Sequence, residues 1–164
     1  MSLSPLSALS PLDGRYAPKV DALRATLSEA GFMHHRVKVE ISWLQALSQA
    51  GFDEIKPFSA EANALLEKLV SEFSEASAQR IKDIEAVTNH DVKAVEYWLK
   101  EQVQDMPELV TASEFIHFAC TSEDINNTSH GMMLKTARDE VMLPALQKLI
   151  ARLTELAHNN ADVA

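Results

Sequence analysis

Residues 134–157 read LKTARDEVMLPALQKLIARLTELA, and this stretch decides the fold class. Its apolar residues recur every three or four positions, as on the face of an α-helix, and they form two stripes. A helix with two such stripes is apolar around much of its circumference, so we expect it to be buried in a helical bundle or a subunit interface. The first stripe comprises Leu134, Ala137, Val141, Ala145, Leu149, Leu153 and Leu156, and the second Met142, Leu146, Ile150, Leu153 and Ala157.

The long helix is expected to run from Asp124 to about Ala157. Pro144 lies inside it, where proline removes one backbone hydrogen bond and clashes with the carbonyl group of Glu140, so we expect a kink rather than a stop. A single long apolar helix cannot bury itself. Residues 112–164 are therefore expected to be the truncated start of a central long-helix domain.

Shorter amphipathic segments precede the long helix. We expect a short helix from Val20 to Ala30, closed by Gly31 in a left-handed cap, and a second helix that Gly51 ends. Further helix starts are predicted at Ser59, Ser74 and Thr88, a capping box at Thr111 to Glu114, and a short helix carrying Phe115, Phe118 and Ala119. The apolar faces of the main segments comprise Met33, Val37, Ile41, Leu44 and Leu47, then Ala62, Leu65, Leu66, Leu69 and Phe73, then Ala78, Ile81 and Ile84, then Val92, Val95, Leu99 and Val103.

The composition agrees with helices throughout. Only 4 Gly and 6 Pro occur in 164 residues, which favours long helices over many short strands. The sequence therefore predicts an all-α fold, with a small helical N-terminal domain at residues 1–111 followed by the first long helix of a central helical bundle at residues 112–164.

Charge and targeting signals limit the classes of function. The formal net charge of −9 disfavours binding to nucleic acid, because phosphate groups are repelled. The single cysteine, Cys120, fits a reducing compartment. The N-terminus has neither the basic nor the apolar region of a signal peptide, and no window is apolar enough to span a membrane. We expect a cytoplasmic protein without a membrane partner.

Three short segments contain residues suited to chemistry. In the first, Asp13 to Tyr16, Gly14 allows a tight turn and the guanidinium group of Arg15 suits a phosphate or carboxylate. A plain turn with a surface arginine is the alternative. In the second, Thr88 to Lys93, Thr88 and Asp91 are spaced to cap a helix reciprocally, and His90 lies in the first turn. A plain cap with a surface histidine is the alternative there.

The third segment runs from His117 to Asp124. Thr121 and Asp124 are again three residues apart where a helix begins, and the hydroxyl groups of Thr121 and Ser122 with the nearby amides could hold a carboxylate. The charges of Glu123 and Asp124 oppose this unless they point away or act as caps. His117 either reaches a site or is a partly buried histidine whose hydrogen bonds are satisfied within the fold. Cys120 is expected to be packed rather than reactive.

Metal binding is not expected from the histidine and cysteine spacing. His34 and His35 are adjacent, so they do not share one helix face, and no pair has the spacing of metal ligands. His130 and His158 are expected to be exposed or at an interface.

Together the segments carry a family resemblance. Residues 10–16 (SPLDGRY), 88–97 (TNHDVKAVEY) and 115–127 (FIHFACTSEDINN) resemble the bacterial adenylosuccinate lyases of the fumarase/aspartase superfamily. The resemblance implies an all-helical carbon–nitrogen lyase that eliminates fumarate from adenylosuccinate, giving AMP, and from SAICAR, giving AICAR. It further implies a homotetramer, a small purine nucleotide as substrate, and no cofactor.

The resemblance also assigns roles to residues. Arg15 and Tyr16 would bind the nucleotide, with Arg15 on the phosphate. Asn89, His90 and Asp91 would line the site, with His90 close to the reacting part of the substrate. The remaining assignments are Thr121 and Ser122 on a succinyl carboxylate and His117 as a supporting contact.

The chain departs from the family in one respect. The family's general acid lies in a Thr-His-Gly segment and its general base is a serine in a mobile loop, and neither segment occurs in this sequence. We therefore expect this chain alone to be inactive. Two alternatives stay open: a non-catalytic helical interaction or oligomerisation module on the same scaffold, and another superfamily lyase, such as one acting on argininosuccinate.

Overall fold

The computed structural model describes residues 4–163, and every regular element within this range is a helix. The predicted all-α class is confirmed. The chain divides into two compact units. One unit consists of residues 29–132, and the other combines the start of the chain up to Ser28 with the residues from Met133 onward.

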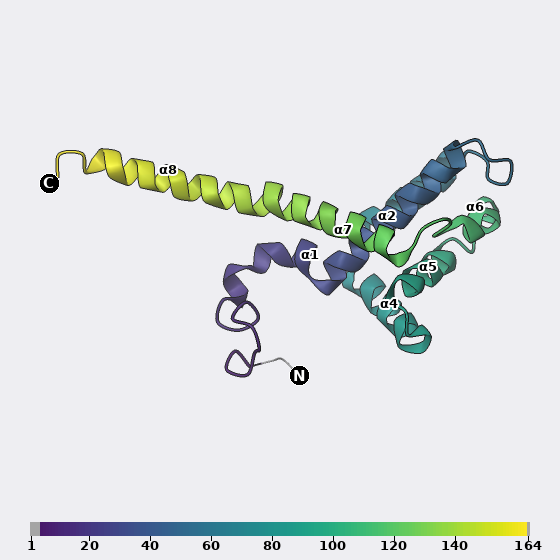
Figure 1. Ribbon diagram of the computed structural model, residues 1–164, viewed down its shortest axis with the longest axis horizontal. Helices are drawn as coiled ribbons and strands as arrows, with labels where there is room; N and C mark the ends of the chain where they lie inside the picture. The colour runs from purple at the N-terminus through teal and green to yellow at the C-terminus, as the bar shows by residue number, and fades with distance from the viewer. Residues whose placement is uncertain (1–3, 164) are drawn as a thin grey trace. The chain divides into compact units, whose positions relative to one another are not determined.

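The unit of residues 29–132 is organised around its longest helix, α2 (Glu29–Gln49). This helix contacts α3 (Ala60–Ser71), α4 (Glu75–Thr88) and α5 (Asp91–Gln102). Helices α4 and α5 pack closely against each other (Figure 1). The buried core is built from the predicted apolar faces of these helices, including Val37, Leu66, Ile81 and Leu99. The remaining elements are α6 (Pro107–Ala112), the 3-10 helix η3 (Ser113–Phe115) and the first part of α7 (Ser122–Thr136).

Several predicted helix ends are confirmed. Gly51 follows the end of α2 with φ +85°, a left-handed conformation that glycine adopts without steric cost. The Ser59 side chain caps α3 by accepting a hydrogen bond from the amide of Ala62. Ser74 forms a capping box with Ser77 at the start of α4. These local signals set the helix boundaries as expected.

The prediction of a helix from Val20 to Ala30 is wrong. Only α1 (Arg24–Leu27) is α-helical there, because Ser28 adopts an extended backbone with ψ 171° and separates α1 from α2. Gly31 is not a cap but lies buried inside α2. The apolar spacing around this break is continuous enough to hide it in the sequence.

Two predictions near residue 115 are also wrong. Thr111 does not begin a helix but lies within α6, where its hydroxyl donates to the carbonyl oxygen of Pro107. Glu114 does not complete a capping box, because its carboxylate pairs with Lys100. The residues after η3 form turns rather than a helix, and Ala119 has a left-handed φ of 60°.

The second unit contains both ends of the described chain. Near the N-terminus lie the 3-10 helices η1 (Ala17–Lys19) and η2 (Asp21–Leu23), followed by α1. Helix α7 is followed without a break by a π-helical segment, η4 (Ala137–Met142), and then by α8 (Leu143–Asn159). Residue Pro144 falls in the first turn of α8, where proline is tolerated, so the helix does not stop there, as predicted. Within this unit, η2 lies against η4.

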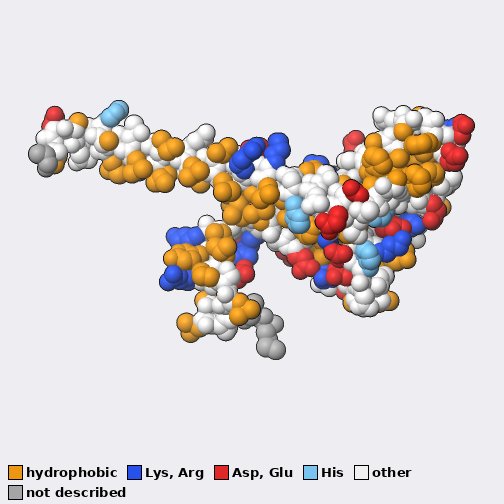
Figure 2. All heavy atoms as spheres, in the orientation of Figure 1, with side chains coloured by type: hydrophobic (Ala, Val, Ile, Leu, Met, Phe, Trp, Pro, Cys, Tyr) orange, Lys and Arg blue, Asp and Glu red, His pale blue; other side chains and the backbone are white. Residues whose placement is uncertain are grey.

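Helix α8 has no buried residue in this structure. Its large apolar side chains lie along the helix in Figure 2 and are exposed. The set consists of Leu143, Leu146, Leu149, Ile150, Leu153 and Leu156. An exposed apolar surface of this extent is typical of an interaction surface.

Candidate active site

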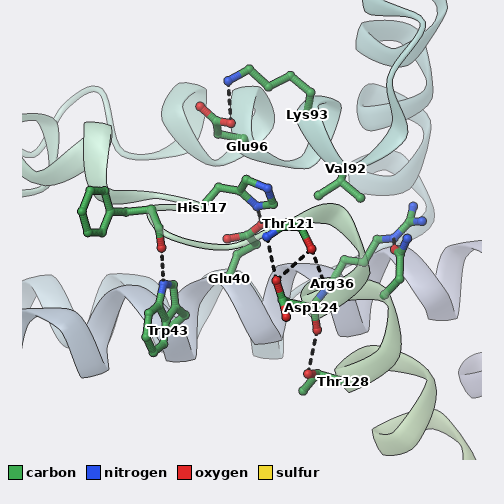
Figure 3. Close-up of polar contacts among 12 residues, drawn as sticks. Arg36, Glu40, Trp43, Val92, Lys93, Glu96, His117, Thr121, Asp124 and Thr128 are labelled. Carbon is green, nitrogen blue, oxygen red and sulfur yellow. Dashed lines mark hydrogen bonds and ion pairs between the residues drawn. The ribbon is translucent and has the colours of Figure 1, made fainter.

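One face of α2 organises the candidate site. Arg36, Glu40 and Trp43 are spaced four and three residues apart, so they project from the same side of the helix. Each makes a polar contact with a segment outside α2, and all of these segments belong to the unit of residues 29–132 (Figure 3).

Arg36 joins the start of α5 to α7. Its Nη2 donates to Oδ2 of Asp91 at 2.5 Å, and its Nε donates to Oδ1 of Asn126 at 2.9 Å. The guanidinium carbon lies 3.9 Å from the centre of the Phe32 ring, a cation–π contact. Only 5% of Arg36 is exposed. This buried, planar donor fork therefore fixes two predicted site segments relative to one another.

The contact with Arg36 affects the pKa of Asp91, one of the predicted substrate-binding residues. Partial burial acts to raise its pKa, but the Val92 amide and the Arg36 guanidinium outweigh burial and hold the pKa below its ordinary value. The predicted reciprocal cap between Thr88 and Asp91 is wrong. Thr88 is the last residue of α4, and Asn89 ends that helix in a left-handed conformation with φ 51°.

His90 itself caps α5. Its Nδ1 accepts a hydrogen bond from the amide of Lys93 at 3.1 Å, so this nitrogen is unprotonated and the neutral ring carries its proton on Nε2. The His90 side chain is exposed. It thus presents an N–H donor beside Asn89 and Asp91, which suits contact with an anionic or carbonyl oxygen.

His117 contacts the buried carboxylate of Glu40. Its Nδ1 lies 2.6 Å from Oε1 of Glu40, and the His117 side chain is 22% exposed whereas Glu40 is fully buried at 0%. The other carboxylate oxygen of Glu40, Oε2, is buried and has no partner within residues 4–163. Burial raises the pKa of Glu40, and the contact with His117 opposes that rise.

The segment after His117 is held in an unusual backbone conformation. His117 has φ 65° and Ala119 has φ 60°, left-handed values that non-glycine residues adopt at a cost. Trp43 stabilises the segment by donating its indole N–H to the carbonyl oxygen of Phe118 at 2.8 Å. Cys120 is half-buried. Burial raises the pKa of its thiol, and the negative charges of Glu40 and Asp124 raise it further. This agrees with the prediction that Cys120 is packed rather than reactive.

Thr121 and Asp124 cap the start of α7, as their spacing predicted. Oδ2 of Asp124 accepts from both the amide and the hydroxyl group of Thr121, at 2.7 and 2.8 Å. The Thr121 amide and hydroxyl hold the pKa of Asp124 below its ordinary value. Because the donors of Thr121 are engaged by Asp124, a carboxylate bound here would draw on Ser122 and the first amides of α7 or displace Asp124.

A cavity of about 500 Å³ lies between α2 and α7 beside this cap. Trp43, Cys120 and Thr128 contribute to its lining, together with apolar side chains. The cavity is also lined by Ala119 and by Asp124 at the start of α7, so the cap of α7 lies at the edge of a cavity.

Arg15 and Tyr16 belong to the other unit, which combines the start of the chain with residues 133–163. Both are exposed, and the Arg15 guanidinium carbon lies 4.7 Å from the centre of the Tyr16 ring. Gly14 is buried in the preceding turn, where its amide donates to the carbonyl oxygen of Ser10. A Cβ at this position would lie 3.1 Å from the carbonyl oxygen of Pro5, so the turn favours glycine.

Sequence reasoning missed Arg36 and Glu40. Both flank the apolar face of α2 and look like members of a solvated surface, yet both are buried. Their spacing of four residues with opposite charges is that of an ordinary surface pair on a helix, so it gave no sign of their burial. The other histidines have local roles: His34 bonds to the carbonyl oxygen of Val70, His35 to that of Gly31, and His130 is exposed and stacks on Phe32.

Within residues 4–163, no group of three or more histidine, cysteine, aspartate or glutamate side chains is arranged to hold a metal ion. In the same range, no helix combines the length and the apolar character that crossing a membrane requires.

Comparison with known proteins identifies the family. The model of the protein family described as "Lyase" matches residues 14–164. The chain belongs to this lyase family. It is 64% identical over 158 residues to the adenylosuccinate lyase of Haemophilus influenzae, an alignment that covers 96% of this chain and 35% of that protein. These matches confirm the resemblance found in the sequence motifs.

Further adenylosuccinate lyases align over nearly the whole chain. The Escherichia coli K12 protein is 57% identical over 164 residues, which is 99% of this chain and 36% of that protein. The Legionella pneumophila Corby protein is 42% identical over 165 residues, which is 100% of this chain and 36% of that protein. The chain therefore spans about a third of the length of the curated relatives that it matches.

Proposed function

We propose that this chain forms part of an adenylosuccinate lyase, a carbon–nitrogen lyase that releases fumarate from adenylosuccinate and from SAICAR. The observation that carries the proposal is the identity of 57–64% to adenylosuccinate lyases over 96–99% of the chain. A non-catalytic helical module is not favoured, because the similar proteins are named as lyases.

The reaction is a β-elimination. A base removes a proton next to a carboxylate, and an acid protonates the departing nitrogen, so the protein must hold anionic groups and position proton donors. In this proposal the Nε2–H of His90 lies close to the reacting part of the substrate, flanked by Asn89 and Asp91. Ser122 and Thr121 hold a succinyl carboxylate, and His117 supports the site. No metal or organic cofactor is needed for these transfers.

The remaining roles concern binding and assembly. Arg15 and Tyr16 bind the nucleotide, with Arg15 on its phosphate, because a guanidinium group matches phosphate geometry. The exposed apolar side chains of α8 pair with other copies in a homotetramer. Residues 1–111 and 112–164 are proposed as an N-terminal domain and the start of the central domain, and the cytoplasm as the location. The principal acid and base are supplied by segments absent from this sequence.

The test begins by sequencing the reading frame past the codon for Ala164. The full-length product is then assayed for fumarate release from adenylosuccinate and SAICAR, with argininosuccinate as a control substrate. The proposal expects activity on the first two substrates and none on the third. Activity on argininosuccinate alone, or a stop codon directly after Ala164, would overturn it.

A further inference from the structure

The buried carboxylate of Glu40 is costly for the fold. An ionised carboxylate that leaves water needs hydrogen bonds to both oxygens, yet Oε2 of Glu40 has no partner within the described residues. The neighbouring core positions on α2, Val37 and Ile41, carry ordinary apolar side chains. An apolar residue at position 40 would fill the same space at lower cost, so packing alone does not explain a glutamate there.

Within residues 4–163, Glu40 has one hydrogen-bond partner, and that partner is a candidate site residue. The 2.6 Å contact joins Oε1 of Glu40 to Nδ1 of His117, across 77 positions in the sequence. His117 has a left-handed backbone conformation, and its side chain points toward Glu40 on α2 in Figure 3. Figure 3 shows one ring nitrogen of His117 facing Glu40, which leaves Nε2 as the nitrogen that can contact anything else.

We propose that Glu40 is a positioning residue that fixes the ring orientation and tautomer of His117, so that Nδ1 carries a proton and Nε2 serves the substrate. The inference deepens the proposed lyase function and rests on it for its kinetic part. In its ionised form the Glu40 carboxylate only accepts hydrogen bonds, so it selects the Nδ1–H form of the ring. Carboxylates that orient a functional histidine act in this way in other enzymes.

The proposal gives the two site histidines complementary roles. The amide of Lys93 fixes Nδ1 of His90 as an acceptor, which leaves an Nε2–H donor. Glu40 holds Nδ1 of His117 as a donor, so that Nε2 has a free lone pair when the ring is neutral. One histidine thus donates and the other accepts, an arrangement that suits a substrate carrying both an anionic group and an amine.

Other charged groups surround the pair. Glu96 on α5 acts on the Glu40 carboxylate, and is itself paired with Lys93 at 2.7 Å and Lys100 at 3.2 Å. Asp124 on α7 acts electrostatically on His117, and Cys120 lies near Glu40. Glu96 provides a matched control, because it is a second buried carboxylate of the same unit that has no bond to His117 within the described residues.

The first test observes the tautomer directly. The chain is labelled with ¹⁵N-histidine, His117 is assigned by its loss in His117→Gln, and the protonation of its two ring nitrogens is read by NMR. We expect a proton on Nδ1 in the wild type and in Glu96→Gln, and loss of that preference in Glu40→Leu, which removes the acceptor. An unprotonated Nδ1 in the wild type, or an unchanged tautomer in Glu40→Leu, would overturn the proposal.

The second test measures kinetics in the full-length enzyme. We expect Glu40→Gln to lower kcat by about 10–100-fold with little change in KM, as losses of orienting partners do. The effect should vanish in a His117→Gln background, and Glu96→Gln should not reproduce it. A Glu40→Gln effect that persists without His117 would contradict the proposal. Absence of wild-type activity would defeat the lyase assignment alone, because the NMR result stands independently.

Discussion

Replacement of Arg36 by methionine tests whether α2 holds the site segments together. The substitution removes the bonds to Asp91 and Asn126 and the contact with the Phe32 ring. A hydrogen bond to a charged group contributes about 1.5–3 kcal/mol, and the cation–π contact about 1 kcal/mol. Asp91 is only half-buried, so water replaces part of the lost contact, and the methionine side chain fills part of the space. We expect a net loss of about 2–4 kcal/mol in the free energy of unfolding.

The measurement is urea unfolding followed by the fluorescence of Trp43 and Trp98, both in the same unit as Arg36. Arg80→Met is the matched control, because Arg80 makes a two-bond contact with Glu101 on the surface, where solvent screens it. We expect a clearly smaller loss for Arg80→Met. Equal losses for the two variants would refute the conclusion that the buried Arg36 side chain holds α7 and the start of α5 together.

Three further predictions concern the fold. Val95→Ala should lower the free energy of unfolding by about 2–3 kcal/mol, because two buried methyl groups are lost and a cavity remains. The same change at Val87 should have little effect, because Val87 is 82% exposed whereas Val95 is 0% exposed. Equal urea midpoints for the two variants would contradict the placement of Val95 in the core. Asp91→Asn should destabilise the chain at neutral pH, because the pKa of Asp91 is lowered in the folded state. That contribution is present above the unfolded pKa of about 3.8 and is lost as pH falls through the folded value, so a pH-independent difference in urea midpoint would argue against it. Asp124→Ala should speed hydrogen exchange at the Thr121 amide, which loses its acceptor, and unchanged protection there would speak against the cap.

Local patterns in the sequence predicted most of the helices. The apolar recurrence of residues such as Val37, Leu66 and Leu99 follows directly from the helical period, and caps such as Ser59 and Ser74 act within one turn. The errors arose where two local signals compete. At residues 88–91, the left-handed conformation of Asn89 ends one helix and leaves His90, rather than Thr88, to cap the next.

The polar framework of the site was not accessible from the sequence. A charged residue beside an apolar helix face is ordinarily solvated, so Arg36 and Glu40 gave no local sign of burial. Their partners lie 55 and 77 positions away, and only tertiary packing brings them together. The sequence motifs identified Asp91 and His117 as site residues. Their partners on α2, Arg36 and Glu40, became visible only in the structure.

We propose that residues 89–91 and 117–122 line one substrate site. The most direct measurement is a crystal structure of the full-length protein with AMP and fumarate bound. We expect density for the products beside His90 and Ser122, with Nε2 of His117 turned toward them and Nδ1 still in contact with Glu40. Products bound elsewhere, with His90 and His117 facing bulk solvent, would contradict it.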